Sequence, residues 1–255
     1  MKNFRHPQRP RKNTLVIGPE KILEAIRNGI ALDRIYVENR AEGVVFNELK
    51  ALAREQHIPV NYVPAAKLQS FNAGEHRGSI AQLARVHYYD LQDIISQVQE
   101  SGEAPLFLIL DGVTDIRNIG GIARTAYCCG VHAIIIPDKG VGALNEDAML
   151  TSAGALEKIA FCRVNSLMKA VDELHLNGIR VLATEMKGSR AVNECDLTEP
   201  VAIVMGSEEK GIYPALLKIC DEKISIPMKG DFESLNVSVA TGMVLYEAMT
   251  QRLKG

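Results

Sequence analysis

VAIVMGSEEKG, residues 201–211, joins an uninterrupted apolar run to a polar turn that begins and ends with glycine. An apolar run of this length suits a strand that is buried on both faces of a sheet. Gly206, where the run ends, leaves room for a ligand to approach the backbone. The stretch therefore predicts a buried parallel strand that ends at a candidate binding loop.

Four other apolar runs in the second half of the chain have the same character. Helical segments separate them, and strands that alternate with helices predict an α/β fold built on a parallel sheet. Ligands collect outside the carboxyl ends of such strands, and the loops that follow these runs are rich in Gly, Asn, Ser and acidic residues. That composition favours a cofactor site, although loop chemistry alone gives a similar composition. The runs are LFLIL at 106–110, HAIIIP at 132–137, IRVLATE at 179–185 and KISIPM at 223–228.

The first half predicts a smaller α/β domain at residues 14–88. Short β-type runs there alternate with helical patterns at EKILEAIRNG and FNELKALAREQ. DLQDIISQVQE then predicts a helix, and SGEAP is its polar exit, so we place a linker at residues 89–105. The larger domain follows at residues 106–255. The β-type runs of the first half are TLVI, RIYV, VNYV and GSIAQLARV.

The composition is that of a soluble globular protein. The chain has 255 residues, 47% of them hydrophobic, and no apolar run approaches the roughly 20 residues that a membrane helix needs. The start of the chain lacks the apolar core of a secretory signal, so we expect a cytoplasmic protein. The odd number of cysteines and the lack of a C-x-x-C pair or a His cluster predict reduced thiols and no metal site.

The formal net charge of −2 gives no global indication of a nucleic-acid partner. The charges are unevenly placed, however, because basic residues and prolines dominate the first 13 positions. We expect residues 1–13 to form a flexible basic arm, while a solvated terminus with no partner fits the charge equally well. The basic residues are Lys2, Arg5, Arg9, Arg11 and Lys12.

Common nucleotide and hydrolase motifs are missing from the sequence. No segment fits the P-loop pattern, and Gly140-Val141-Gly142 does not continue as the dinucleotide fingerprint requires. The nucleophile elbow G-x-S-x-G and the zinc motif H-E-x-x-H are also missing. The sequence therefore argues against a nucleoside-triphosphate enzyme, a dinucleotide-dependent oxidoreductase and a Ser or His protease.

Polar residues gather at two predicted helix starts. Asn118 lies near the first, with Arg124 almost two turns further along, and an N-cap Asn with a surface Arg would explain this pair without any function. At the second, Ser234 and Asn236 precede a helical face that includes Val237. Capping needs one such residue, so the surplus suggests that this helix start also receives a ligand.

Three phrases together resemble the SpoU/TrmH family of RNA 2′-O-ribose methyltransferases, within the SPOUT superfamily. They are RNIGGIARTA, VMGSEEKG and ISIPMKGDFESLNVSVATGM, and they occur in the family's order over about 150 residues. The first half is also similar to the small substrate-binding domain, related to RNA-binding ribosomal proteins, that many members carry. Within it, HRGSIAQLARVHY resembles the bacterial members that act on a guanosine of 23S ribosomal RNA.

The resemblance implies a parallel sheet whose C-terminal segment forms a deep trefoil knot, a homodimer, and S-adenosylmethionine bound in the knot. It implies catalytic roles for Asn118, Arg124, Glu208 and Asn236, with Arg124 as the base or as a base-assisting residue. Because a guanidinium is very hard to deprotonate, Arg124 could instead hold an RNA phosphate that accepts the proton. The implied cofactor-binding residues are Thr184, Gly206, Ile226, Leu235 and Ser234.

The substrate that the resemblance implies is a guanosine ribose in 23S ribosomal RNA or a large-subunit precursor. A transfer RNA guanosine is the alternative within the family, because the catalytic motifs do not encode the target. A catalytically silent RNA-binding assembly factor is a second alternative, against which the intact Asn118, Arg124 and Asn236 argue.

Overall fold

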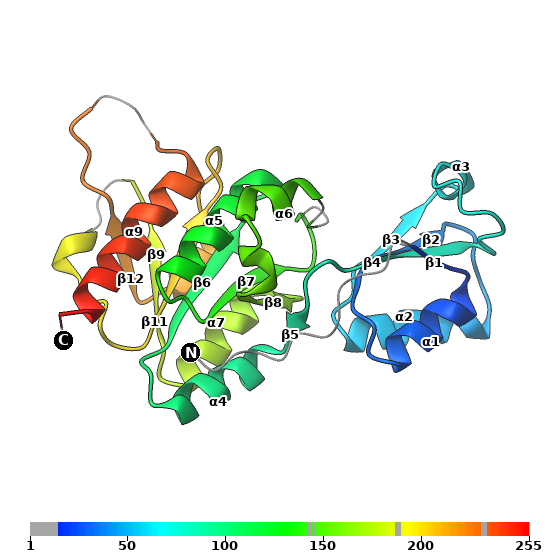
Figure 1. Ribbon diagram of the computed structural model, residues 1–255, viewed down its shortest axis with the longest axis horizontal. Coiled ribbons are helices and arrows are strands. Elements are labelled where there is room, and N and C mark those ends of the chain that lie inside the picture. Colours follow the sequence, from blue (N-terminus) through cyan, green and yellow to red (C-terminus); the bar gives the residue numbers. More distant parts are fainter. Residues whose placement is uncertain (1–14, 142–143, 145, 187–189, 231–233, 255) are drawn as a thin grey trace. The chain divides into compact units, whose positions relative to one another are not determined.

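The computed structural model describes residues 15–141, 144, 146–186, 190–230 and 234–254. The expected basic arm, residues 1–13, lies outside them. The chain divides into two compact units, Met1–His87 and Tyr88–Gly255. Each unit has a sheet of its own. Figure 1 labels the elements of both.

The first unit contains a four-stranded sheet in the order β1-β4-β2-β3. β4 is antiparallel to both β1 and β2, whereas β2 and β3 are parallel. The apolar faces of α1 and α2, including Ile22 and Leu49, pack with β2 residues into one buried core. The elements are β1 (Leu15–Ile17), α1 (Pro19–Arg27), β2 (Leu32–Glu38), α2 (Val44–Glu55), β3 (Val60–Val63), α3 (Ala65–Gln69) and β4 (Ser79–Leu83).

The second unit contains an eight-stranded sheet in the order β10-β12-β9-β11-β6-β7-β8-β5. Every neighbouring pair in this sheet is parallel, so the predicted α/β fold with a parallel sheet is confirmed. The central strands are almost fully buried because helices cover both faces. The strands are β5 (Tyr88–Tyr89), β6 (Leu106–Asp111), β7 (Ala133–Pro137), β8 (Ala160–Val164), β9 (Arg180–Thr184), β10 (Arg190–Ala191), β11 (Val201–Gly206) and β12 (Glu222–Ser225).

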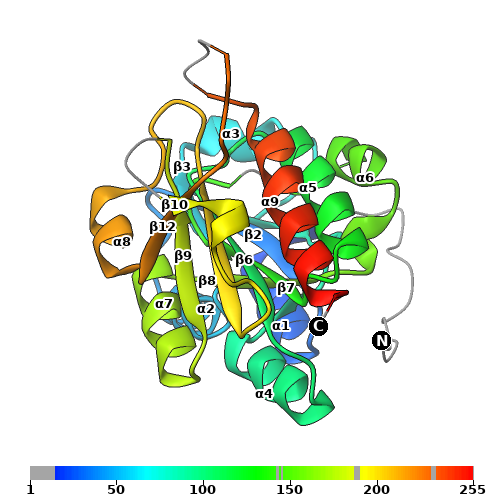
Figure 2. The same cartoon turned by 90° about the vertical axis from the view of Figure 1, so that its left-hand side faces the viewer.

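Figure 2 shows α5, α6 and α9 on one face of this sheet and α7 and α8 on the other. Polar side chains begin several of these helices, since Asp90, Asp115 and Ser166 each accept a hydrogen bond from a backbone amide of the first turn. The helices are α4 (Leu91–Ser101), α5 (Ile116–Cys128), α6 (Glu146–Ser152), α7 (Leu167–Leu176), α8 (Pro214–Ile219) and α9 (Val237–Arg252), with short 3₁₀ turns η1 (Ala155–Glu157) and η2 (Val192–Glu194).

Residues 89–105, where the sequence predicts a linker, lie in the second unit. Tyr88 and Tyr89 form β5, which pairs with β8. The predicted helix is present as α4, and its apolar residues are buried in the second unit because they form one continuous face. These buried residues are Leu91, Ile94, Ile95 and Val98.

Candidate active site

The sheet order brings the predicted site residues to neighbouring strand ends. β12, β9, β11 and β6 are adjacent and parallel, so their carboxyl ends lie along one edge of the sheet. Thr184 is the last residue of β9 and Gly206 the last of β11, while Ile226 follows β12 directly. The Thr184 hydroxyl donates a hydrogen bond to the Val204 carbonyl at 2.8 Å, which ties β9 to β11 at this edge.

The loop after β11 is a tight turn that only glycine permits at its first residue. Ser207 and Gly211 exchange two backbone hydrogen bonds, at 2.9 and 3.2 Å. A side chain at Gly206 would place its Cβ 2.3 Å from the Gly211 carbonyl carbon and 2.5 Å from the Ile212 nitrogen. Because these are backbone atoms, they cannot move aside cheaply. The turn carries Glu208 out beyond the strand end.

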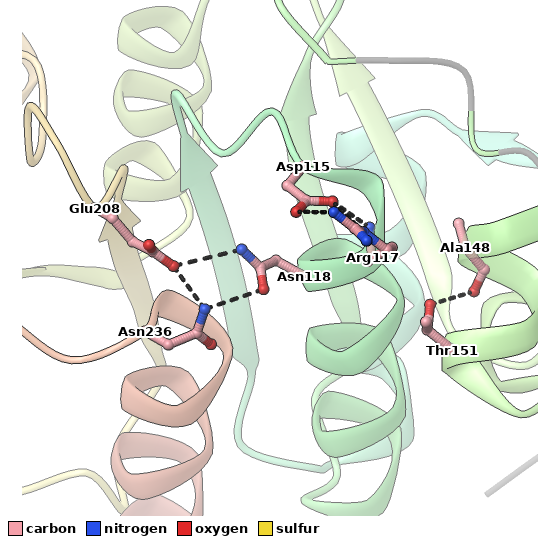
Figure 3. A network of polar contacts seen from close by, with 7 residues as sticks. All are labelled: Asp115, Arg117, Asn118, Ala148, Thr151, Glu208 and Asn236. Carbon is pink, nitrogen blue, oxygen red and sulfur yellow. Dashed lines mark hydrogen bonds and ion pairs between the residues drawn. The ribbon is translucent and has the colours of Figure 1, made fainter.

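Glu208, Asn118 and Asn236 form one hydrogen-bonded network, although they come from three segments far apart in the sequence (Figure 3). The Asn236 amide donates to Glu208 Oε1 at 2.6 Å and to Asn118 Oδ1 at 3.2 Å. The Asn118 amide donates to the same Glu208 oxygen at 3.4 Å. The backbone N–H of Val237 is a third donor to that oxygen, at 3.1 Å. The carboxylate therefore fixes the orientation of both carboxamides.

Asn236 also begins α9. Its Oδ1 accepts from the backbone amides of Ser238 and Val239, at 3.0 and 3.4 Å, and from the Ser238 hydroxyl at 2.5 Å. One side chain thus caps the helix with its oxygen and joins the network with its nitrogen. Ser234 is exposed and takes no part in these bonds among the described residues. The surplus of polar residues before α9 is explained, in part, by this double role of Asn236.

Arg124 is not part of the network. It lies exposed on α5, and no residue that the structure describes forms a hydrogen bond or ion pair with its side chain. The helix is capped by Asp115, which accepts from the Arg117 amide at 2.9 Å. Asn118 is therefore free of the capping role that would have explained it structurally.

The sequence reasoning did not single out Asp115. The signal was available, because an Asp directly before an amphipathic helical segment predicts an N-cap. Ser238, one of the polar residues that the sequence places at the start of this helix, supports Asn236 through its hydroxyl, and its Cβ lies 3.7 Å from the position a Cβ would take at Gly121. The small residue at 121 lets α9 approach α5 closely, which positions Asn236 beside Asn118.

The cysteines are neither paired with one another nor part of the site. All five cysteines are free, and burial raises the pKa of the Cys220 thiol to about 11. Burial also raises the pKa of Cys162 well above its ordinary value. Within the described ranges, no group of three or more His, Cys, Asp or Glu side chains could hold a metal ion, and no helix is long and apolar enough to cross a membrane.

Two families match this chain. Residues 105–246 match the SpoU rRNA Methylase family, and residues 15–89 match the domain described as RNA 2′-O ribose methyltransferase substrate binding. The chain belongs to the SpoU family of RNA methyltransferases. The family assignment made from the three phrases is confirmed, and 2′-O-methylation of RNA is the reaction of this family.

Relatives match over 64% to 94% of this chain. YacO of Bacillus subtilis, which is assigned to the TrmH family of tRNA/rRNA methyltransferases, is 36% identical over 238 residues, covering 93% of this chain and 95% of YacO. The SpoU methyltransferase AviRb from Streptomyces viridochromogenes, solved with the cofactor AdoMet, is 26% identical, with a TM-score of 0.60 over 94% of this chain and 91% of its own. The TrmH/SpoU tRNA modifying enzyme of A. aeolicus is 32% identical, with a TM-score of 0.55 over 64% of this chain and 85% of its own.

Proposed function

We propose that this protein transfers the methyl group of S-adenosylmethionine to the ribose 2′-hydroxyl of a guanosine in 23S ribosomal RNA. The observation that carries the proposal is the network of Asn118, Glu208 and Asn236 at the carboxyl ends of β6 and β11. These three residues stand in three separate phrases typical of the family, and folding brings them within hydrogen-bonding distance. A silent RNA-binding factor would not need this arrangement.

The residues assigned to the cofactor fit a group held by backbone and apolar contacts. Gly206 has no side chain to cover its backbone, and Ile226 and Leu235 are half-buried apolar residues. The Thr184 hydroxyl already donates to Val204, so Thr184 would offer its backbone instead. Ser234, exposed just before Leu235, completes the proposed set. S-adenosylmethionine, when bound, supplies a methyl group already activated by its sulfonium.

The chain's own task is then to orient the ribose and to help remove the hydroxyl proton. Asn118 and Asn236 are held by Glu208, so they can hold a ribose hydroxyl in line for transfer. Arg124 is exposed on α5, where it can bind an RNA phosphate. Since a guanidinium stays protonated, we assign the proton-accepting role to that phosphate, with Arg124 holding it in place.

We also propose the trefoil knot. The last helix, α9, lies beside α5, whereas the strand before it, β12, is separated from β6 by β9 and β11. The turn at 207–211 stands at the end of β11, between these two positions. This return of the C-terminal segment past two strands supports a segment threaded behind another loop.

A homodimer is the proposed assembly. α9 has a second apolar stripe opposite its buried face, formed by Val239, Met243 and Tyr246, which are 52%, 45% and 62% exposed. Their spacing of four and three residues places them on one face of the helix. A second copy of the chain would cover this stripe. The stripe lies on α9, the same helix that begins at the site with Asn236. Sedimentation of the purified protein should give the mass of two chains.

Ribosomal RNA is the proposed substrate because of the first unit. This unit matches the substrate-binding domain of RNA 2′-O ribose methyltransferases, and HRGSIAQLARVHY within it resembles the enzymes that modify a 23S guanosine. The basic residues 2–12 could follow phosphates beyond the target. A cytoplasmic location follows from this substrate. The relatives are assigned to both tRNA and rRNA, so a transfer RNA guanosine is the competing target.

The experiment incubates the protein and labelled S-adenosylmethionine with 23S ribosomal RNA and, separately, with transfer RNA, both from cells that lack the enzyme. The labelled nucleotide is then mapped. Label on one ribose of 23S RNA is the expected result. Label confined to transfer RNA would overturn the proposed substrate, and no transfer to either RNA would overturn the proposed activity.

A further inference from the structure

A surface pocket of about 530 Å³ lies at the first turn of α5, on the side of the helix that faces away from the network. Its lining residues are Asp115, Ile116, Arg117, Leu150 and Thr151. Figure 3 shows Asn118 turned toward Glu208 and Asn236, while Asp115 and Arg117 lie on the side that faces α6. Small-molecule sites commonly have volumes of about 300 to 1,000 Å³, so the pocket can hold a nucleobase.

The two helices that line this pocket, α5 and α6, are in close contact. A Cβ at Gly120 would come within 2.0 Å of Thr151 Oγ1 and 2.7 Å of the Ala148 carbonyl oxygen, so α5 and α6 touch at this point. The Thr151 hydroxyl donates to that same carbonyl at 3.1 Å, as Figure 3 shows. Leu150, next along α6, is nonetheless 77% exposed. A large apolar side chain so exposed at a pocket rim offers a surface on which a flat base can pack.

Asp115 supplies the acceptor in the pocket. Hydrogen bonding from the Arg117 backbone N–H holds the pKa of this carboxyl below its ordinary value, so at neutral pH it is ionised and only accepts hydrogen bonds. Arg117 also forms an ion pair with it at 3.4 Å, and the Arg117 side chain is 72% exposed. An exposed guanidinium can turn to a phosphate when a nucleotide enters.

The position of the pocket fits the base of the nucleotide whose ribose is methylated. The base is bonded to C1′, which is the direct neighbour of C2′, so a ribose at Asn118 has its base close by. Asp115 precedes Asn118 by three residues, or about 4.5 Å along a helix axis. Guanine presents two adjacent donors, N1–H and N2–H, on its Watson–Crick edge, whereas adenine presents an acceptor at N1. A carboxylate therefore pairs with guanine and rejects adenine.

We infer that this pocket receives the guanine base of the target nucleotide, with Asp115 as the residue that selects guanine. Leu150 and Ile116 pack against the base, and Arg117 binds the attached phosphate. The inference rests on the proposed function, because it places the base beside a ribose held by the network. It extends the proposed function by naming the group, the Asp115 carboxylate, that distinguishes guanosine from adenosine.

The test uses the full chain, isotopically labelled at Ile and Leu methyl groups, titrated with GMP, IMP and AMP and followed by NMR. GMP should shift the methyl signals of Ile116 and Leu150 and bind about tenfold more tightly than AMP, with IMP between them because it lacks the N2 amine. Asp115→Asn keeps the helix cap but replaces one acceptor by a donor. It should remove the preference for GMP. Asp172→Asn, an exposed acid on α7, is the matched control and should leave the preference unchanged.

Methyl signals of Ile116 and Leu150 that do not respond to GMP would overturn the inference. So would equal affinities for the three nucleotides in the wild type, or an unchanged preference in Asp115→Asn. S-adenosylmethionine binding is measured by calorimetry on the same samples. If the cofactor binds and the pocket does not select guanine, only the pocket inference fails. If the pocket selects guanine and the cofactor does not bind, the proposed function fails instead.

Discussion

At the residue scale, Glu208 and Glu209 are adjacent acids with different surroundings. Glu208 Oε1 accepts three hydrogen bonds, from Asn118, Asn236 and the Val237 amide. Glu209 is exposed, and among the described residues it has no such partner. Position in the motif alone could only favour Glu208. The geometry gives that choice a physical basis, because only the Glu208 carboxylate, of the two, accepts these hydrogen bonds among the described residues. Hydrogen bonds to a carboxylate are stronger than those to a neutral acceptor.

Glu208→Gln is predicted to slow methyl transfer by about tenfold to a hundredfold, since hydrogen bonds to a neutral amide hold Asn118 and Asn236 less firmly. Glu209→Gln should stay within about twofold of wild type, because surface changes of this kind have small effects. Single-turnover transfer to the substrate RNA measures both. Equal rates in the two variants would show that the network does not position the reacting groups.

Some contacts of single residues could not be predicted from the sequence. Asn236 could be identified as a helix cap from its place before an apolar face, but its bond to Asn118 spans 118 positions and depends on the fold. Asp115 takes the cap that Asn118 could have held. The catalytic role of Arg124 remains a prediction, because an exposed, long side chain has many rotamers and its position is set by what it binds.

At the scale of elements, the turn after β11 decides where Glu208 lies. Gly206→Ala should lower the free energy of unfolding by about 1 to 3 kcal/mol, because the added carbon meets backbone atoms of Gly211 and Ile212. The shifted turn should also reduce methyl transfer. Gly211→Ala is the control: its φ of +64° disfavours a side chain, but the space around it is open. It should lower stability by about 1 kcal/mol, the lower end of the cost of a side chain at positive φ, because the added carbon meets no other atom.

Chemical unfolding and methyl transfer, measured on both variants, check this. A Gly206→Ala protein as stable and active as Gly211→Ala would contradict the tight turn.

One strand could not be predicted from the periodicity of the apolar residues. β8 was not predicted because Arg163 interrupts its apolar run; the structure buries Arg163 to 7% exposure, with its guanidinium 3.5 Å from the Tyr88 ring centre. A buried cation over an aromatic ring has no signature in an apolar pattern.

At the scale of the whole molecule, the alternation of strands and helices was enough to predict a parallel sheet, because each strand had to be apolar to be covered on both faces. The order of the strands in the sheet could not be predicted from this alternation. β9 lies beside β11 and β12 lies beyond β9, while β7 and β8 lie beyond β6. This order places the ends of β6 and β11 together, and with them Asn118 and Glu208. Tertiary pairing, which no local pattern encodes, builds the site.

We propose that the network of Asn118, Glu208 and Asn236 directs methyl transfer to a ribose hydroxyl. The most direct measurement is nucleoside mass spectrometry of substrate RNA after a single turnover, for wild type and Asn118→Ala, with S-adenosylmethionine affinity measured on the same preparations. Wild type should form 2′-O-methylguanosine, and Asn118→Ala should form it at least about 100-fold more slowly while binding the cofactor with similar affinity. A methyl group on the base, or an Asn118→Ala protein that turns over at the wild-type rate, would contradict the account.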